Sequence, residues 1–272
     1  MSDRFDLAGR RIVITGGGGV LCGELAKSLA EAGAIIAVLD VDEAAAQTVA
    51  RAITDRGGTV LSVTCDVTSA ESLEQAVQRT ERELGPVDAL INGAGGNLVA
   101  ASTSEQRSFF ELPAEALRGV MDLNVLGTIL PSQTFGRRMA DRKRGIILNI
   151  ASMNAFRPLT NIPAYSAAKA AVSNFTQWLA VHMCRNYSPQ IRVNAIAPGF
   201  FLTQQNRFLL VDEATGELTP RGRTIVEHTP MGRFGQPGDL VGTVSWLLSD
   251  ASAFVTGVVV PVDGGFAAYG GV

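Results

Sequence analysis

Cysteine and histidine are scarce in this 272-residue chain, which has three cysteines and two histidines. Cys22, Cys65 and Cys184 are odd in number, form no CxxC pair and make no cluster with histidine of the kind that binds zinc. This scarcity argues against a disulfide framework and against a structural zinc site, so we expect no bound metal. The reducing cytoplasm is the compartment that fits such cysteine usage.

The sequence also lacks a strong charge excess and a long apolar run. Its formal net charge is −3, which gives no basic footprint for nucleic acid or for an anionic membrane. No apolar run approaches the roughly 20 residues that span a bilayer, and the first residues lack the apolar segment of a signal peptide. We therefore expect a cytoplasmic protein that binds neither nucleic acid nor membrane.

What the chain does contain is a regular alternation of strand and helix patterns. Arg11–Thr15 is a β-branched run, followed by the glycines Gly16 to Gly19 and an apolar helical pattern from Val20. Further predicted strands are 34–39, 59–65, 87–91, 145–150, 191–196 and 258–260, and further helices are 42–56, 69–84, 113–140, 163–186 and 237–248. This order predicts an α/β fold: a doubly wound, Rossmann-type domain with a seven-stranded parallel sheet flanked by helices.

No repeat or linker interrupts this alternation, so we expect one domain over residues 1–272. Its cofactor-binding portion would span about 10–150 and its catalytic and substrate-binding portion about 150–272. Two long segments, 93–112 and 198–237, break the rhythm. Both begin where a strand ends, which is where doubly wound sheets bind ligands, so both are predicted walls of a cleft.

The glycines after the first predicted strand have a physical reason to be there. Without a Cβ, they let the backbone and the helix N-terminus approach a pyrophosphate, although a merely tight turn stays open. Asp40, at the end of the second strand, is placed to accept hydrogen bonds from an adenosine ribose diol, or it is an ordinary turn residue. No Arg or Lys lies between Thr15 and Lys27, so NAD is favoured over NADP.

A second motif is Tyr165-Ser-Ala-Ala-Lys169 at the start of a predicted helix. Residues four apart share a helix face, with Cβ atoms roughly 5–6 Å apart. A lysine charge at that range could lower a tyrosine pKa by roughly two units, so the phenol would exchange protons near neutral pH. For this spacing alone, an accidental pair is the simpler reading.

Taken together, the motifs resemble the short-chain dehydrogenase/reductase family over the whole chain. The matching positions, in order, are Thr15-Gly16, Asp66-Val67, Asn92-Gly-Ala94-Gly95, Asn124, Ser152, Tyr165-x-x-x-Lys169, Pro198-Gly199 and Val262-Asp-Gly-Gly265. So many agreements in order make an accidental Tyr165–Lys169 pair improbable.

The resemblance implies a role for each matching residue. Tyr165 would move the proton, Lys169 would lower its pKa and hold the nicotinamide ribose, Ser152 would bind the reacting oxygen, and Asn124 would support a proton-carrying water chain. The implied cofactor-binding residues are Gly16, Gly18, Gly19, Val20, Leu21, Asp40, Asp66, Val67, Asn92, Ala94, Gly95, Tyr165, Lys169, Pro198 and Gly199. For Asn92 and Asn124 a structural role also stays open. Family members are usually tetramers or dimers, so a homotetramer is expected.

The first turn departs from the family pattern. Ungapped, Thr-Gly-x-x-x-Gly-x-Gly would place glycines at Val20 and Cys22, whereas Gly19 and Gly23 are displaced by one position. We interpret this as a variant turn in which Gly19 approaches the phosphates. Cys22 is then predicted to be a small buried residue rather than a reactive thiol.

The loops around the expected cleft resemble the D-mannonate oxidoreductase (fructuronate reductase) branch of the family. This implies hydride transfer between NAD and a sugar acid, with D-fructuronate and D-mannonate as the pair. A hexuronate needs hydrogen-bond partners and a cation for its carboxylate, and the candidates are Asn97, Asn154, Arg157, Gln204 and Arg207, with Gln205, Asn206 and His228 nearby. Alternatives are gluconate with its keto form, a less polar 3-oxoacyl-type ketone suited to Phe156, Phe200 and Phe201, and a dinucleotide-sensing regulator without catalysis.

Overall fold

The computed structural model describes residues 4–203, 207–213 and 215–271 and contains one parallel sheet of seven strands. Its strand order is β3-β2-β1-β4-β5-β6-β7, the doubly wound arrangement in which the chain order reverses beside β1. The predicted fold class is therefore confirmed. The strands are β1 Arg11–Thr15, β2 Ile35–Asp40, β3 Val60–Thr64, β4 Ala89–Asn92, β5 Gly145–Ile150, β6 Ile191–Pro198 and β7 Val259–Val262.

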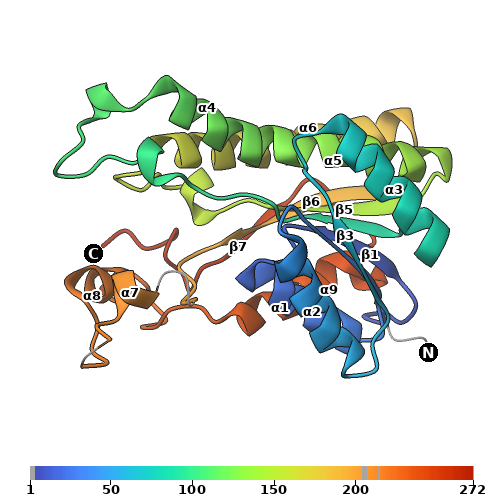
Figure 1. Cartoon of the computed structure of the whole chain (residues 1–272), viewed down its shortest axis with the longest axis horizontal. Helices are drawn as coiled ribbons and strands as arrows, with labels where there is room; N and C mark the ends of the chain where they lie inside the picture. The colour runs from blue at the N-terminus through green and yellow to red at the C-terminus, as the bar shows by residue number, and fades with distance from the viewer. Residues whose placement is uncertain (1–3, 204–206, 214, 272) are drawn as a thin grey trace.

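Helices cover both faces of the sheet (Figure 1). Helices α3, α4, α5 and α6 lie on one face, and α1, α2 and α9 lie on the other. The helices are α1 Val20–Glu31, α2 Glu43–Thr54, α3 Ala70–Leu84, α4 Ala114–Met121, α5 Gly127–Asp141, α6 Pro163–Asn186, α7 Arg207–Leu210, α8 Pro220–Glu227 and α9 Val241–Leu248. Short turns of helix are η1 Val99–Ala101, η2 Phe109–Glu111, η3 Asp122–Leu126, η4 Met153–Ala155, η5 Pro237–Leu240 and η6 Asp250–Ser252.

The period-2 geometry of a strand divides the core into two layers. On β1, the side chains of Ile12 and Ile14 pack with α1 residues such as Leu25, while Val13 between them packs on the opposite face with Phe135 of α5. These side chains are at most 1% exposed. Both faces of the strand are buried, which explains why its sequence reads as a continuous apolar run.

The helix predicted over 113–140 is interrupted in the structure. Helix α4 passes into the π-helical turn η3, and α5 begins after it. A π-turn inserts an extra residue into the helical ladder and often occurs at functional sites. Here it carries Asn124, which is fully buried. The periodic pattern predicted the helix but not the inserted turn, because one extra residue scarcely changes the apolar spacing.

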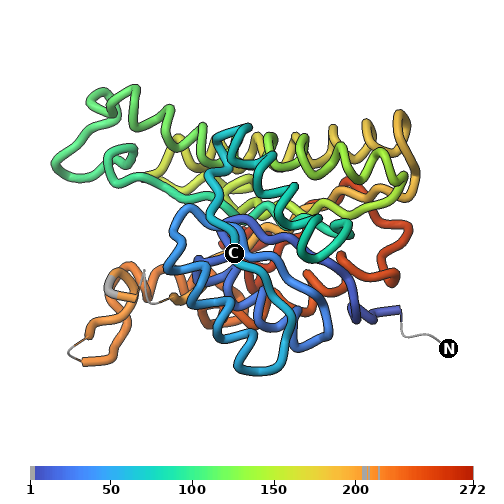
Figure 2. Tube along the Cα trace, turned by 45° about the vertical axis from the view of Figure 1, so that its right-hand side comes forward, coloured from blue at the N-terminus to red at the C-terminus, as the bar shows by residue number. Residues whose placement is uncertain are grey.

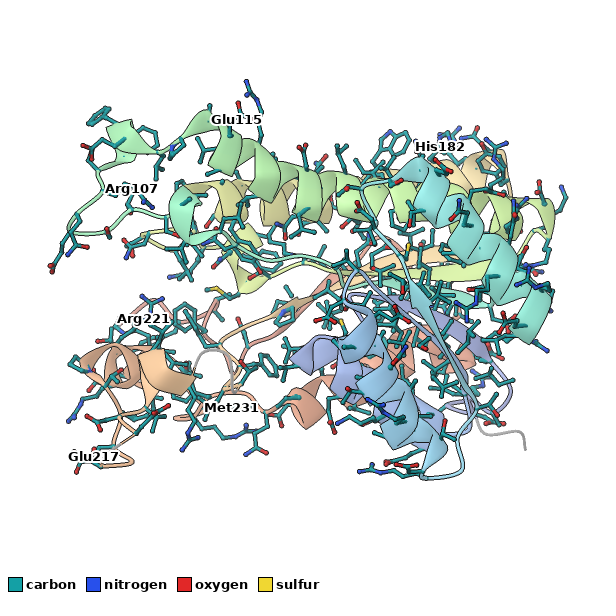
Figure 3. The ribbon with its side chains drawn as sticks, viewed as in Figure 1. Arg107, Glu115, His182, Glu217, Arg221 and Met231 are labelled. Atoms are coloured by element: carbon teal, nitrogen blue, oxygen red, sulfur yellow. The ribbon has the colours of Figure 1, made fainter. Side chains whose placement is uncertain are left out.

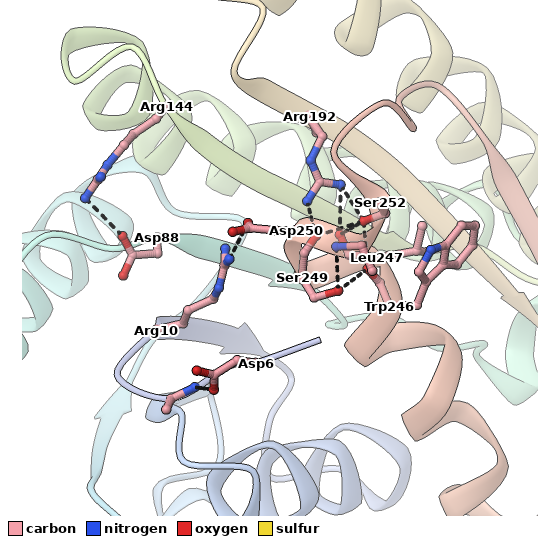
Figure 4. Close-up of polar contacts among 12 residues, drawn as sticks. Asp6, Arg10, Asp88, Arg144, Arg192, Trp246, Leu247, Ser249, Asp250 and Ser252 are labelled. Atoms are coloured by element: carbon pink, nitrogen blue, oxygen red, sulfur yellow. Dashed lines mark hydrogen bonds and ion pairs between the residues drawn. The ribbon is translucent and has the colours of Figure 1, made fainter. Parts of the chain in front are cut away.

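At the amino-terminal edge of the sheet, a buried arginine joins β6 to the end of α9 (Figure 4). Arg192 Nη1 donates to the carbonyl of Leu247 and to Ser252 Oγ, both at 2.9 Å, and Nη2 donates to the carbonyl of Ser249 at 3.0 Å. Burial, together with the nearby charge of Arg10, lowers the pKa of Arg192. Through these hydrogen bonds, the Arg192 guanidinium satisfies carbonyl groups that the end of α9 leaves unpaired.

The two segments that interrupt the alternation extend beyond the opposite, carboxyl-terminal edge. Residues 93–112 and the lobe with α7 and α8 project from the same end of the sheet in both views (Figures 1 and 2). Their backbones stand on opposite sides of the sheet plane, so side chains from both can face the strand ends. Among the described residues, no helix combines the length and the apolar character needed to cross a membrane.

Candidate active site

A cavity of about 690 Å³ lies along the carboxyl ends of β1, β2 and β4. Many of the predicted cofactor-binding residues line it: Gly16, Gly19, Val20, Leu21, Asp40, Asp66, Val67, Ala94, Gly95 and Gly199. The lining also includes residues that the sequence analysis did not assign to the cofactor: Cys22, Val41, Cys65, Thr68, Gly93, Leu123, Phe200, Phe201 and Thr203. The first βα turn and the segments after β2, β3 and β4 thus form one continuous surface.

The glycine-rich turn is shaped by close backbone contacts. Gly16 has φ +63°, and a Cβ there would lie 2.7 Å from Cα of Ala94. Gly18 does not line the cavity; its N–H donates to Asp40 Oδ2 at 2.9 Å. Gly19 is the N-cap of α1 and supplies no side-chain cap, so the first N–H groups of the helix stay available to an anion.

Cys22 fills space behind this turn. Its side chain is 6% exposed, and a Cβ at Gly93 would lie 2.2 Å from its Sγ. Burial raises the pKa of the thiol to about 12, although the charge of Lys169 acts in the opposite direction. The prediction that Cys22 packs as a small buried residue is confirmed, because a thiol in this state is protonated and inert at neutral pH.

The charged groups in the described lining of the cavity are acidic. Asp40 and Asp66 are the charged groups among the described lining residues, which include no arginine or lysine. Asp40 also accepts a hydrogen bond from Asp42 N at 3.0 Å, which orients its carboxylate. A free helix N-terminus for the pyrophosphate and a carboxylate for a ribose diol are the groups that a nicotinamide adenine dinucleotide requires.

The predicted catalytic pair lies on the first turns of α6, next to the end of β5. Lys169 is 4% exposed, its Nζ donates to the carbonyl of Ile150 at 2.8 Å, and it lies 5.6 Å from the centroid of the Tyr165 ring. Burial lowers the pKa of Lys169 from 10.5 to about 8. Pro163 in the first turn of α6 fixes the start of the helix and thereby the position of Tyr165.

The pKa of Tyr165 contradicts the value expected from the four-residue spacing. Burial raises this pKa above its ordinary value of 10, and a hydrogen bond with the Ser152 hydroxyl only partly offsets the increase. Lys169 does not contribute to this shift, and its ammonium group donates a hydrogen bond to the Ile150 carbonyl. The expected depression of the tyrosine pKa is therefore wrong for the protein without cofactor, and the phenol is protonated at neutral pH.

Asn124 holds the backbone of the loop after β4. Asn124 Nδ2 donates to the carbonyls of Gly96 at 2.7 Å and Val120 at 2.8 Å, and its Oδ1 accepts from Gly96 N at 3.2 Å. A Cβ at Gly95 would lie 2.7 Å from this Oδ1 and 3.2 Å from Lys169 Nζ, so Asn124 and Lys169 approach the same glycine.

Asn92 ends β4 beneath this loop rather than in the cavity lining. Its amide donates to Ser132 Oγ and to Asn149 Oδ1, both at 2.8 Å. Pro198 likewise does not line the cavity; it is the buried last residue of β6. Both positions therefore shape the floor of the site through the strands that carry them.

A second cavity, of about 310 Å³, adjoins the first through their shared lining residue Phe200. It lies between the segment that precedes α6 and the lobe that carries α8. Its lining consists of Leu159, Thr160, Asn161, Ile162, Phe200, Arg221, Thr224, Ile225, His228 and Phe266. Ile162 lies three residues before Tyr165, so this cavity lies near the start of α6.

The predicted substrate-binding residues are dispersed. Arg157 and Arg207 are exposed and line neither cavity. The amide of Asn97 donates to Ser102 Oγ at 2.8 Å within its own loop. Asn154 is 4% exposed and follows Ser152, and its buried Oδ1 lacks a protein partner among the described residues. Gln204, like Gln205 and Asn206, lies outside the described residues.

Sequence reasoning missed Arg221, the one arginine or lysine in the described linings of the two cavities. The signal was present, because Thr219-Pro220 reads as an N-cap followed by a first-turn proline. Arg221, Thr224 and His228 then recur at helical spacing. Within the described part of the chain, no group of three or more His, Cys, Asp or Glu residues could hold a metal ion.

Comparison with known proteins agrees with this geometry. A family model described as enoyl-(acyl carrier protein) reductase, of the short-chain dehydrogenase/reductase type, matches residues 21–267. The uncharacterized oxidoreductase UxuB of Bacillus subtilis is 46% identical, with 98% of each chain covered.

Solved structures show the same similarity. A protein from Haemophilus influenza, named provisionally as a D-mannonate oxidoreductase and solved with bound NAD, is 47% identical, with a TM-score of 0.92 and 98% of each chain covered. A gluconate 5-dehydrogenase from Burkholderia cenocepacia J2315, in complex with NADP and tartrate, is 34% identical, with a TM-score of 0.86 and 98% of each chain covered. The chain therefore belongs to the short-chain dehydrogenase/reductase family and is an oxidoreductase that uses a nicotinamide dinucleotide to interconvert alcohol and carbonyl groups.

Proposed function

We propose that this enzyme interconverts D-mannonate and D-fructuronate with NAD as its cofactor. The observation that carries the proposal is a group of hydrogen-bonding side chains in the cavity near the start of α6, namely Thr160, Asn161, Thr224 and His228. Near Ser152, Asn154 has a buried amide oxygen that lacks a partner among the described residues. Hydroxyl groups of a sugar acid would hydrogen-bond to these polar side chains, whereas an acyl chain has no group that could do so.

The side chains at the start of α6 would perform the proton transfer. Ser152 would donate a hydrogen bond to the carbonyl oxygen of the keto acid, and Tyr165 Oη would give that oxygen its proton. The raised pKa of Tyr165 keeps this proton on the phenol at neutral pH, where it is available for transfer to the substrate oxygen. The bound nicotinamide supplies the hydride for reduction, or accepts it for oxidation.

Asp40 supports NAD rather than NADP. Its carboxylate lies in the cavity lining at the end of β2, and the described lining offers no cation to a 2′-phosphate. A phosphate there would meet like charge, which is unfavourable in a partly desolvated site. We expect NADH to bind at least about tenfold more tightly than NADPH, a difference of about 1.4 kcal/mol or more.

A second candidate pair is gluconate and its keto form. The similarity to a gluconate 5-dehydrogenase favours it, and its carboxylate and hydroxyl groups make the same demands on the cavity. Both candidates differ from a 3-oxoacyl ketone, which the apolar rings of Phe200 and Phe266 could contact but which would not use the polar lining.

The test is a rate assay that follows NADH oxidation with D-fructuronate, 5-keto-D-gluconate and a 3-oxoacyl thioester as separate substrates. We expect the highest kcat/KM for D-fructuronate and a decrease of about 10²-fold or more in Tyr165→Phe, because that variant lacks the acidic proton. Turnover of the thioester without turnover of either keto acid would refute the sugar-acid assignment. Full activity in Tyr165→Phe would refute the proton-transfer role.

A further inference from the structure

The substrate carboxylate of a sugar acid requires a cation near the site, and the lobe with α8 offers one. Arg221 is the second residue of α8 and belongs to the lining of the 310 Å³ cavity. Figure 3 shows Arg221 on the side of the lobe that faces the layer with α4 and α6, whereas Glu217 lies at the far end of the lobe. No aspartate or glutamate is among the described residues that line this cavity.

The packing of α8 fixes which of its side chains face the cavity. Gly222 packs against α7, because a Cβ there would lie 2.1 Å from the carbonyl oxygen of Leu210. Ile225 is 7% exposed and joins Leu210 and Val211 in a small apolar cluster. One face of α8 is thus packed against α7. A neighbouring face carries Arg221, Thr224 and His228, which are three and four residues apart and line the cavity.

The charge of Arg221 is available for a ligand. Among the described residues, no carboxylate lies within ion-pair distance of its guanidinium. Arg233, which follows α8 in the chain, is by contrast paired with Asp239 at 2.6 Å. His228 Nδ1 lies 2.9 Å from the Thr224 carbonyl. If Nδ1 carries the proton, it donates there, and Nε2 is left to the cavity. The planar guanidinium of an arginine can donate two parallel hydrogen bonds to a carboxylate, and the neighbouring hydroxyl and imidazole groups can donate further ones.

We infer that Arg221 binds the substrate carboxylate and thereby sets the preference for sugar acids over neutral ketoses; this inference rests on the proposed function. Phe200 lines both this cavity and the cofactor cavity, and Ile162 of its lining lies three residues before Tyr165. A keto acid bound with its carbonyl at Tyr165 would extend its hydroxyl-bearing carbons along Asn161 and Thr224. Its carboxylate would then reach Arg221 on α8.

The inference is tested by kinetics of Arg221→Gln with D-fructuronate and NADH. Loss of a charged hydrogen bond of about 1.5–3 kcal/mol predicts a KM for the keto acid about 10- to 150-fold higher, with the KM for NADH unchanged within about twofold. Arg221→Lys keeps the charge but not the fork and should recover part of the loss. The matched control is Arg223→Gln: Arg221 and Arg223 are both exposed arginines of α8, but Arg223 does not line the cavity.

A binding measurement separates this inference from the proposed function. Titration of D-mannonate into the enzyme–NADH complex by calorimetry does not depend on turnover. Binding to wild type and to Arg223→Gln, but not to Arg221→Gln, supports the role of Arg221 even if D-fructuronate is not the preferred substrate. Unchanged affinity and KM in Arg221→Gln would overturn the inference while leaving the proposed function intact. A larger effect in Arg157→Gln or Arg207→Gln would overturn it as well, and absence of binding to wild type would overturn both.

Discussion

Lys169 places an ammonium group in the protein interior with a single described hydrogen bond, to the carbonyl of Ile150. Removing a charge from water is unfavourable unless it is well paired. The pKa of Lys169, lowered to about 8, reports this cost. A difference of this size from 10.5 corresponds to about 3 kcal/mol of native-state destabilisation at neutral pH.

We predict that Lys169→Met makes the protein without cofactor more stable at pH 7, by up to about 3 kcal/mol, although it removes the charged partner of Tyr165. Between pH 8 and 10 the unfolded chain keeps the lysine proton while the native protein loses it, so the destabilisation of wild type declines as pH rises. The stability difference between the two proteins should therefore shrink over this range. Urea unfolding at pH 7, 8, 9 and 9.5 measures it.

Comparing the two proteins at each pH matters because other groups titrate in the same range. Cys22 and Cys65 have raised pKa values in the native state, so their thiols lower stability as pH rises above about 9 in both proteins. Their contribution largely cancels in the difference. A stability difference that stays constant from pH 7 to 9.5 would contradict the assignment of a pKa of about 8 to Lys169.

The same residues show what sequence can predict at this scale. The Tyr165–Lys169 spacing and the thirteen-residue distance from Ser152 follow directly from the sequence. The direction in which the pKa of Tyr165 shifts does not follow from the sequence, because it depends on how deeply the folded chain buries the phenol. Arg157 and Arg207 were predicted to bind the substrate, but they line neither cavity. Their positions in the sequence do not determine which cation faces a cavity.

Among the elements, the turn between β1 and α1 depends most on backbone shape. Gly16→Ala would strain a residue at φ +63° and press a Cβ within 2.7 Å of the Ala94 backbone. We expect the loop after β4 to shift, with NADH affinity reduced about tenfold or more and stability reduced by more than the roughly 1–2 kcal/mol of the left-handed conformation alone. Fluorescence titration of NADH and thermal unfolding measure the two effects.

Gly57→Ala is the matched control for this turn. Gly57 has a similar positive φ of +79°, but a Cβ there would meet nothing within 4 Å. It should lose about 1–2 kcal/mol of stability and keep its NADH affinity. Equal losses of NADH affinity in the two variants would show that the contact with Ala94 does not matter for the cofactor site.

The elements of the sheet could be predicted almost entirely, whereas the lobe could not. Strands such as β5 and helix α6 have the predicted bounds, because buried parallel strands and long amphipathic helices impose strong periodic patterns. Helices α7 and α8 are short and lie in a segment rich in Gly and Pro, where local patterns are weak. The Thr219-Pro220 start signal alone does not reveal that Gly222 docks α8 onto α7.

For the whole molecule, the two edges of the sheet have separate roles. The carboxyl edge carries both cavities of the site. The opposite edge is secured by Arg192, by the ion pair of Arg10 with Asp250, and by looser pairs such as Arg144 with Asp88 at 3.8 Å (Figure 4). Stability and catalysis should thus respond to different substitutions.

Arg192→Met tests this separation. It removes the donors that satisfy Leu247, Ser249 and Ser252 at the end of α9, so we expect a loss of about 2–4 kcal/mol and a Tm lower by roughly 5–15 °C. At 25 °C the folded variant should keep its KM for NADH within about twofold, because β6 holds Gly199 and Phe200 at its other end. Arg144→Met, which removes a 69% exposed side chain, should change stability by less than about 1 kcal/mol. A small Tm change accompanied by a large loss of NADH binding in Arg192→Met would show instead that the two edges are coupled through β6.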